Sequence, residues 1–218
     1  EKMLTLVEAY LNEDFRLRAQ FLNSTSAVEH RFGFTVNDEN RDTSWLAPEV
    51  EIPNIGTLKF RGVIDRIDSS PDGKQALILD LKTGSNYGYR DLNNDIFSSG
   101  KKLQLPIYLL AAKKNVPDIK VIAAYWMVGF KGQYKVFPAS PPSFEEIEDD
   151  MNSIMEKIAN GMVSGLFPAN PGSNNSNCRF CDFNQICPQQ KQTYWEQKRS
   201  NDARLSHYLS LEKKESSE

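Results

Sequence analysis

The chain has 218 residues, of which 39% are hydrophobic and 25% charged, as is ordinary for a soluble globular protein with one domain and an ample core. Its net charge of −3 excludes a globally basic nucleic-acid-binding protein, so any DNA contact must come from a local patch. The sequence has neither an apolar run long enough to span a membrane nor a signal peptide, which predicts a cytoplasmic protein without a membrane partner.

The N-terminal part predicts a packing helix over residues 2–23, followed by a strand over 27–34 and a polar loop over 37–43. In the strand, Glu29 is a candidate to support a metal site indirectly, and His30 is expected at the surface. Because the chain opens directly in a helical pattern, we expect it to be a piece of a longer protein. The apolar positions that define the helical pattern are Leu6, Val7, Tyr10, Leu11, Phe15 and Phe21.

A β-hairpin over residues 62–84 dominates the middle of the chain. Strands are predicted over 50–53 and 57–68 around a turn at 54–56, and the second strand continues into the hairpin. Pro71 followed by Asp-Gly, between two apolar runs, is a strong turn signal.

Side chains alternate between the two faces of a strand, so Asp80 and Lys82 share one face of the hairpin with Ile78. The tight turn places Asp65 opposite this stretch, so that Asp65 and Asp80 meet on that face. On the other face we expect a deep core of Leu77, Leu79 and Leu81, together with a structural or substrate-contacting pair, Arg66 and Asp68.

Two carboxylates that face each other in a semi-buried sheet repel each other and cost desolvation free energy. They become favourable around Mg²⁺ or Mn²⁺, which are bound by carboxylates together with substrate phosphate. Lys82 then supplies positive charge where an attacking water or a pentavalent phosphorus builds up negative charge. The pattern predicts metal-assisted phosphodiester hydrolysis. The alternative is an ordinary surface hairpin with solvated charges, because Asp-x-Lys is common in any sequence.

Residues 85–99 are predicted to form a mobile loop beside this site, and residues 101–114 a helix. Gln104 and Tyr108 are four residues apart and therefore share one face of that helix. The alternative is an amphipathic helix with a polar residue near its start. Three loop residues either contact single-stranded nucleic acid or are incidental to a solvated loop: Tyr87, Tyr89 and Arg90.

The remaining elements are predicted to pack the core. They are a central strand over 120–128, a shorter neighbour over 133–138, a helix over 143–164 with a Ser143–Glu146 capping box, a polar helix over 189–211 and a charged tail over 213–218.

All the cysteines of the chain, Cys178, Cys181 and Cys187, fall within ten residues. Such crowding in a chain without a secretory signal argues against a disulfide framework and favours metal binding. Two alternatives stay open. The cysteines are free thiols, or they form a zinc site whose only available fourth ligand is His207.

Four motifs occur in a fixed order: GVIDRID over 62–68, LDLKTG over 79–84, QLPIY over 104–108, and Cys178-x₂-Cys181-x₅-Cys187-Pro188. Together they resemble the RecB-like branch of the PD-(D/E)XK nuclease superfamily, and within it most of all the C-terminal nuclease domain of AddB-type helicase–nuclease subunits. The resemblance covers residues 29–188. No single motif is very specific, whereas four in this order are.

The resemblance implies an α/β fold, a restriction-endonuclease-like mixed β-sheet flanked by α-helices. It implies a nuclease domain over residues 1–188, with residues 189–218 as a C-terminal helix and tail. The implied roles are as follows: Asp65, Asp80 and the backbone carbonyl of Leu81 hold Mg²⁺ or Mn²⁺, Lys82 positions the attacking water, Gln104 points into the site, and Tyr108 supports Gln104.

The resemblance further implies a [4Fe–4S] cluster on Cys178, Cys181 and Cys187, with its fourth cysteine upstream and outside this chain. A metal-binding histidine is also expected on an upstream helix, and neither His30 nor His207 matches it. We expect both missing residues to lie before Glu1 or to be absent.

The function that the resemblance implies is a metal-dependent DNA nuclease that processes single-stranded or duplex DNA ends exonucleolytically in recombinational repair, alongside a helicase–nuclease partner subunit. The alternative is a catalytically weak or inactive nuclease-like module that binds DNA or docks a subunit. A third possibility is a cysteine-based zinc module with an incidental hairpin.

Overall fold

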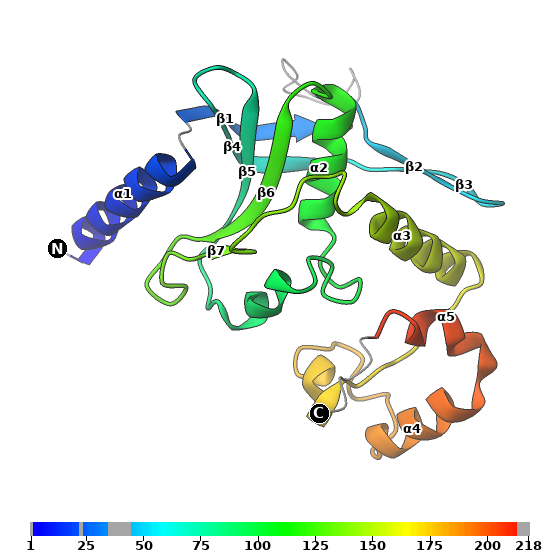
Figure 1. The fold of residues 1–218 in the computed structure, drawn as a ribbon. Coiled ribbons are helices and arrows are strands. Elements are labelled where there is room, and N and C mark those ends of the chain that lie inside the picture. Colours follow the sequence, from blue (N-terminus) through cyan, green and yellow to red (C-terminus); the bar gives the residue numbers. More distant parts are fainter. Residues whose placement is uncertain (1, 22–23, 35–44, 213–218) are drawn as a thin grey trace. The chain divides into compact units, whose positions relative to one another are not determined.

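A computed structural model describes residues 2–21, 24–34 and 45–212 (Figure 1). The predicted loop at 37–43 and tail at 213–218 lie outside these residues. The chain divides into two compact units, Glu1–Ile52 with Gly56–Asn152, and Pro53–Ile55 with Ser153–Glu218. The boundary expected at residue 188 stays a prediction. No helix in the described ranges is long and apolar enough to cross a membrane.

The first unit is built on a five-stranded sheet with the order β1-β4-β5-β6-β7. Its pairs are antiparallel except for β5 and β6, which run parallel and are connected through α2 (Gln104–Asn115). This architecture confirms the predicted α/β class, a mixed sheet with flanking helices that is consistent with a restriction-endonuclease-like fold. The strands are β1 (Ser24–Phe32), β4 (Gly62–Ser69), β5 (Gln75–Lys82), β6 (Lys120–Met127) and β7 (Val136–Phe137).

The strand predicted over 57–68 is in fact two strands. β3 (Gly56–Lys59) pairs with β2 (Glu49–Ile52) in a separate two-stranded sheet, and β4 begins only at Gly62. A continuous strand was wrong because β3 pairs with β2, the backbone N–H of Phe60 still donates to the Pro48 carbonyl, and two residues outside either strand separate β3 from β4. β4 therefore pairs with β1 in the main sheet, independently of the β2–β3 pairing.

The β4–β5 hairpin forms as predicted. Its register pairs Arg66 with Leu79 and Ser69 with Ala76. In the turn, Gly73 has a φ of 70° and donates its N–H to the carbonyl of Ser70 at 2.9 Å. Glycine suits this position because the left-handed backbone conformation costs it no steric strain.

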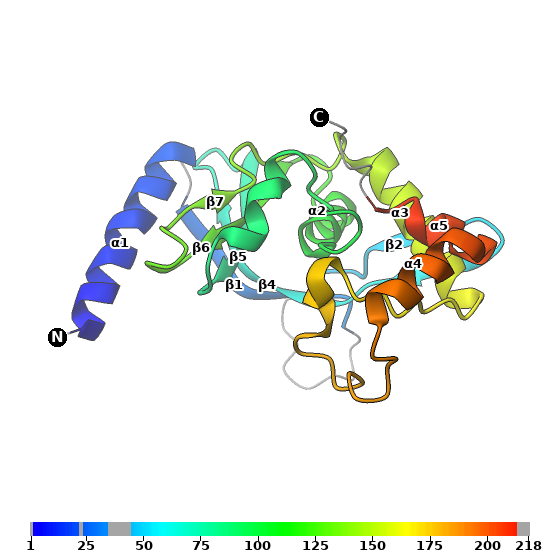
Figure 2. The ribbon, with the colours of Figure 1, turned by 90° about the horizontal axis from the view of Figure 1, so that it is seen from below.

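Helices α1 (Lys2–Phe21) and α2 lie on opposite sides of the sheet (Figures 1 and 2). On the α1 side, Leu77 and Leu79 pack with Leu17 and Trp126, and all of these side chains are nearly inaccessible to solvent. Leu81, expected in the same deep core, is only partly buried. The other face is buried as well, and Ile78 has no exposed surface. A sheet covered on both sides holds any polar group between its layers in a water-poor environment.

The face of α1 that packs against the sheet differs from the one its apolar residues predicted. Tyr10 stacks on Trp126 with ring centroids 5.2 Å apart, and Asp14 and Leu17 are buried. The predicted contact residues are largely exposed because the apolar residues of this helix occupy more than one stripe. Those exposed side chains are Leu6, Val7, Leu11 and Phe15, whereas the side chain of Phe21 lies outside the described part.

Two further boundaries differ from prediction. α2 begins at Gln104 rather than at residue 101, which places Pro106 in its first turn, where proline is tolerated. α3 (Glu148–Val163) begins five residues after Ser143. The backbone N–H of Ser143 nevertheless donates to the Glu146 carboxylate at 2.7 Å, as in a capping box, in the turn that precedes α3.

In the second unit, the helix predicted over 189–211 is interrupted. It consists of α4 (Lys191–Asn201), the short η3 (Ala203–Leu205) and α5 (Ser206–Leu209). Asp202 has extended backbone angles, and its side chain accepts a hydrogen bond from the backbone N–H of Arg204 at 3.1 Å. Aspartate commonly caps a new helix in this way, so the chain turns at this position.

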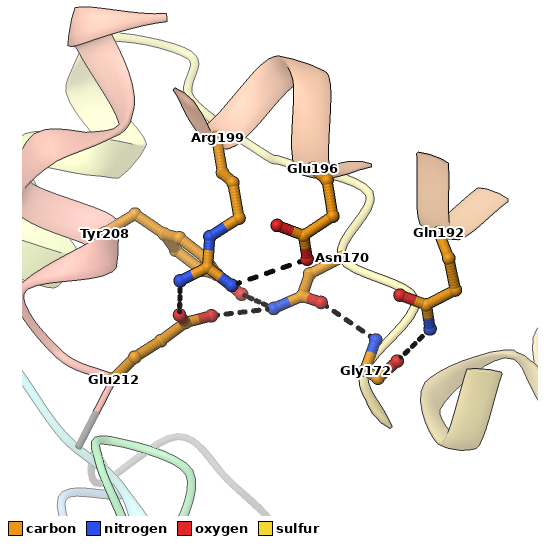
Figure 3. A network of polar contacts seen from close by, with 7 residues as sticks. All are labelled: Asn170, Gly172, Gln192, Glu196, Arg199, Tyr208 and Glu212. Atoms are coloured by element: carbon orange, nitrogen blue, oxygen red, sulfur yellow. Dashed lines mark hydrogen bonds and ion pairs between the residues drawn. The ribbon is translucent and has the colours of Figure 1, made fainter. Parts of the chain in front are cut away.

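A polar network around Asn170 holds the second unit together (Figure 3). The Asn170 amide donates to the Tyr208 hydroxyl and to the Glu212 carboxylate, both at 3.0 Å, and its oxygen accepts the N–H of Gly172 at 2.8 Å. Arg199 on α4 donates to Glu212 at 3.1 Å. The network ties the loop that leads into η2 (Ser173–Cys178) to the C-terminal helices.

Candidate active site

The site begins at Asp65, which is half-buried on β4. Its Oδ2 accepts a hydrogen bond from the backbone N–H of Leu81 at 2.7 Å. The β4–β5 ladder ends at the pair Arg66–Leu79, and Asp65 and Asp80 are the next residues of the two strands. The two carboxylates therefore share the face of the sheet that α2 covers, as the hairpin alternation predicted.

Asp80 on β5 is 1% exposed. Its carboxylate forms an ion pair with Lys82, and its Oδ1 lies 3.4 Å from the Tyr108 hydroxyl. Burial raises the pKa of Asp80, the neighbouring charge of Asp65 raises it further, and Lys82 only partly offsets both. Among the described residues, the Lys82 ammonium is the only polar partner of Asp80 Oδ2. A buried carboxylate oxygen with a single ammonium as its partner is favourable for binding a further cation.

Lys82 and α2 complete the site. Lys82 Nζ donates to Gln104 Oε1 at 3.3 Å, and Gln104 Nε2 donates to the Tyr108 hydroxyl at 2.9 Å. The Tyr108 hydroxyl in turn donates to the carbonyl of Val63 at 2.8 Å. Burial, followed by the charge of Asp80, raises the pKa of Tyr108, so its hydroxyl stays protonated and acts as a donor. The chain of hydrogen bonds anchors Lys82 to the start of α2 and to β4.

The two carboxylates suit a small divalent cation that keeps water molecules as most of its ligands. Within the described ranges, no group of three or more His, Cys, Asp or Glu side chains is placed to hold a metal ion. Asp65 and Asp80 alone suit Mg²⁺ or Mn²⁺, because such ions are commonly held by one or two carboxylates, with water and substrate phosphate as the other ligands. The predicted role of the Leu81 carbonyl as a further ligand stays a prediction.

Arg66 and Asp68 lie on the opposite face, away from this site, and act structurally. Arg66 donates twice to Asp68, at 2.7 and 2.6 Å, and once to Asp14 on α1 at 2.5 Å. All three side chains are buried. Sequence reasoning missed Asp14. The available signal was an acidic residue at helical spacing between Tyr10 and Leu17.

The sequence predicted only some of the aromatic and basic residues near the candidate site. Tyr89 does not extend freely from the loop, since it packs edge-on against Tyr125 with centroids 5.0 Å apart. Tyr125 sits beside Asp80 in the parallel β5–β6 register, and sequence reasoning missed it, although its polar ring in an apolar strand was a signal. Tyr87 is 82% exposed, and Arg90 donates to Asn86 at 3.3 Å.

Two other candidates from the sequence, Glu29 and His30, lie on β1. His30 is half-buried rather than at the surface, packs edge-on to Trp45 at 4.6 Å, and has its pKa lowered by burial. Glu29 is exposed on β1 with a φ of 50°, and its supporting role stays a prediction.

The cysteines belong to the second unit and form no disulfide with one another. Cys178 and Cys187 are half-buried, and Cys181 is exposed. They do not converge on a metal-binding group in the part of the chain that the structure describes. The iron–sulfur cluster therefore stays a prediction.

Comparison with known proteins adds one finding to this geometry. A family model described as the PD-(D/E)XK nuclease superfamily matches residues 1–188. No curated protein matches the chain. Asp65, Asp80, Lys82 and Gln104 all lie within the matched range.

Proposed function

Because the chain belongs to the PD-(D/E)XK nuclease superfamily, we propose that it hydrolyses DNA phosphodiester bonds with a divalent metal held by Asp65 and Asp80. Membership in the superfamily implies phosphodiester hydrolysis, a DNA substrate and a divalent metal. The observation that carries the proposal is the buried Asp80 carboxylate, which is paired with Lys82 and lies within the electrostatic influence of Asp65.

The protein's own residues have distinct tasks in this proposal. Asp65, fixed by the Leu81 N–H, and Asp80 offer their oxygens to Mg²⁺ or Mn²⁺. When bound, such an ion lowers the pKa of a bound water and offsets charge on the phosphate. Lys82 positions the attacking water and stabilises the negative charge that develops on the phosphate oxygens. Gln104 and Tyr108 hold the Lys82 ammonium in that position.

The finer assignment is also proposed. The order of the four motifs supports placement in the RecB-like branch, most like AddB-type nuclease domains. From that placement we propose exonucleolytic processing of DNA ends in recombinational repair, alongside a helicase–nuclease partner subunit. Release of mononucleotides or short products from labelled ends tests the exonucleolytic mode. Cleavage of a closed circular single strand, which has no ends, would contradict that mode.

A [4Fe–4S] cluster with Cys178, Cys181 and Cys187 among its ligands belongs to the same proposal. The apolar side chains of Phe180, Phe183 and Ile186, which stand between these cysteines, are 68–88% exposed, which supports the proposal that a bound group orders this segment. Iron and acid-labile sulfide in the purified protein test it, and stoichiometric zinc would contradict it.

A second candidate function is a nuclease-like module that binds DNA or docks a subunit without cleaving. The observation that favours it is the small number of acidic ligands, since only Asp65 and Asp80 converge within the described residues. Salt-sensitive DNA binding without metal-dependent cleavage would establish this alternative.

The test of the proposed function is cleavage of end-labelled single-stranded DNA with Mn²⁺. Lys82→Ala is expected to lower the rate by about a hundredfold or more, because it removes the charge that stabilises the transition state. Lys74→Ala, an exposed lysine of the same hairpin, is the matched control and should cleave as the wild type does. Equal cleavage by the Lys82→Ala protein would mean that the activity does not come from this site.

A further inference from the structure

A second lysine lies next to the candidate site, on the loop that leads into α2. The backbone N–H of Lys102 donates to the Phe97 carbonyl at 2.9 Å. The Asp95 side chain accepts the N–H groups of Phe97, at 3.0 Å, and Ser99, at 2.8 Å. Ser99 has a φ of 55°, which non-glycine residues rarely adopt. The loop therefore fixes Lys102 two residues before Gln104.

Aromatic rings hold the side chain of this lysine. Lys102 Nζ lies 3.9 Å from the ring centroid of Tyr89 and 5.7 Å from that of Tyr125. Lys82 Nζ lies 5.5 Å from the same Tyr125 ring. Cations at such distances from a ring face are attracted by its negative charge distribution. Tyr125 is thus a neighbour of both ammonium groups, and Tyr89, edge-on to Tyr125, orients the second one.

The two lysines differ in their partners. Lys82 pairs with Asp80, whereas Lys102 forms no ion pair with a carboxylate among the described residues. Burial, followed by the charge of Lys82, lowers the pKa of Lys102, and the charge of Asp80 only partly offsets both. A half-buried cation that no carboxylate contacts directly is stabilised when an anion binds to it.

We propose that Lys102 binds the phosphate of the DNA strand next to the scissile phosphate, with Tyr89 holding its ammonium in place. This proposal rests on the proposed function. Asp65, Asp80 and Lys82 already serve the scissile phosphate, and Lys102 is a second cation that lies at a similar distance from the Tyr125 ring as Lys82 does. A local cation of this kind also gives an acidic chain of net charge −3 the means to hold an anionic strand.

The experiment measures the dissociation constant for a single-stranded oligonucleotide at several NaCl concentrations in EDTA, where metal-dependent cleavage is off. Lys102→Met is expected to weaken binding about tenfold at low salt and to reduce the slope of log affinity against log salt by about 0.7, the value for one phosphate contact on a single strand. Lys102→Arg should keep the slope. With Mn²⁺ present, Lys102→Met should raise KM about tenfold and leave kcat within about threefold, because an adjacent phosphate does not react.

Lys101→Met is the matched control, since Lys101 is an exposed neighbour in the same loop, and it should retain the wild-type affinity and slope. Tyr89→Leu keeps both lysines but removes the ring, so it should weaken binding less and leave the slope unchanged. If the Lys102→Met protein binds the oligonucleotide with the wild-type affinity and salt slope and still cleaves it, the proposed role of Lys102 is wrong, while the proposed function stands. A wild-type protein that neither binds nor cleaves DNA would overturn the proposed function as well.

Discussion

Replacing Asp80 by asparagine is expected to lower Mn²⁺-dependent cleavage of single-stranded DNA by more than about a hundredfold, because the variant loses a metal-binding oxygen of full negative charge. The matched control is Asp72→Asn, an exposed aspartate in the turn of the same hairpin. It should cleave at nearly the wild-type rate. The measurement is the initial rate of product release from an end-labelled strand.

The same Asp80→Asn variant is expected to be more stable than the wild type in EDTA at neutral pH. The folded-state pKa of Asp80 is raised, mainly by burial, so its ionised form opposes folding. The wild type therefore loses stability relative to the variant as the pH rises from about 4, the ordinary aspartate pKa, to the raised value, and the difference then stays constant. Thermal unfolding at several pH values measures this difference. A variant less stable than the wild type would contradict the electrostatic account of the site.

Replacing Arg66 by methionine is expected to destabilise the first unit by about 3–5 kcal/mol, because it leaves the buried carboxylates of Asp14 and Asp68 without their shared cation. Arg18, which pairs with Asp14 at 2.9 Å, cannot replace the two hydrogen bonds to Asp68. Urea unfolding measures the loss.

Two further variants sharpen this test. Arg61→Met removes an exposed arginine just before the same strand and should change the free energy of unfolding by less than about 0.5 kcal/mol. Adding Asp68→Asn to Arg66→Met should recover part of the lost stability, since one buried charge disappears. Equal stability of the Arg66→Met protein and the wild type would mean that the network does not hold α1 to the sheet.

The hairpin was predictable because strand alternation has a period of two residues and the turn at Gly73 is short. These two features alone place Asp65, Asp80 and Lys82 on one face, and Arg66 and Asp68 on the other. Gln104 and Tyr108 followed from helical spacing. Local pattern was sufficient wherever the geometry depends on one element or one tight turn.

Features that depend on tertiary contacts were not predictable in the same way. Helix α1 carries apolar residues on more than one stripe, so only its packing shows that Tyr10, Asp14 and Leu17 face the sheet. Lys102 lies outside α2 and reaches the site only through the loop that Asp95 caps. The break at Asp202 was missed for a local reason instead, since its side chain accepts hydrogen bonds from Arg204, two residues on, in an otherwise helical sequence.

The central claim, that Asp65 and Asp80 hold a divalent metal, is tested most directly by a titration of Mn²⁺ into the metal-free protein. The wild type and the Asp72→Asn control are expected to bind Mn²⁺ alike, and Asp80→Asn to bind it more than about tenfold more weakly. Unchanged Mn²⁺ affinity in the Asp80→Asn protein would contradict the assignment of the site.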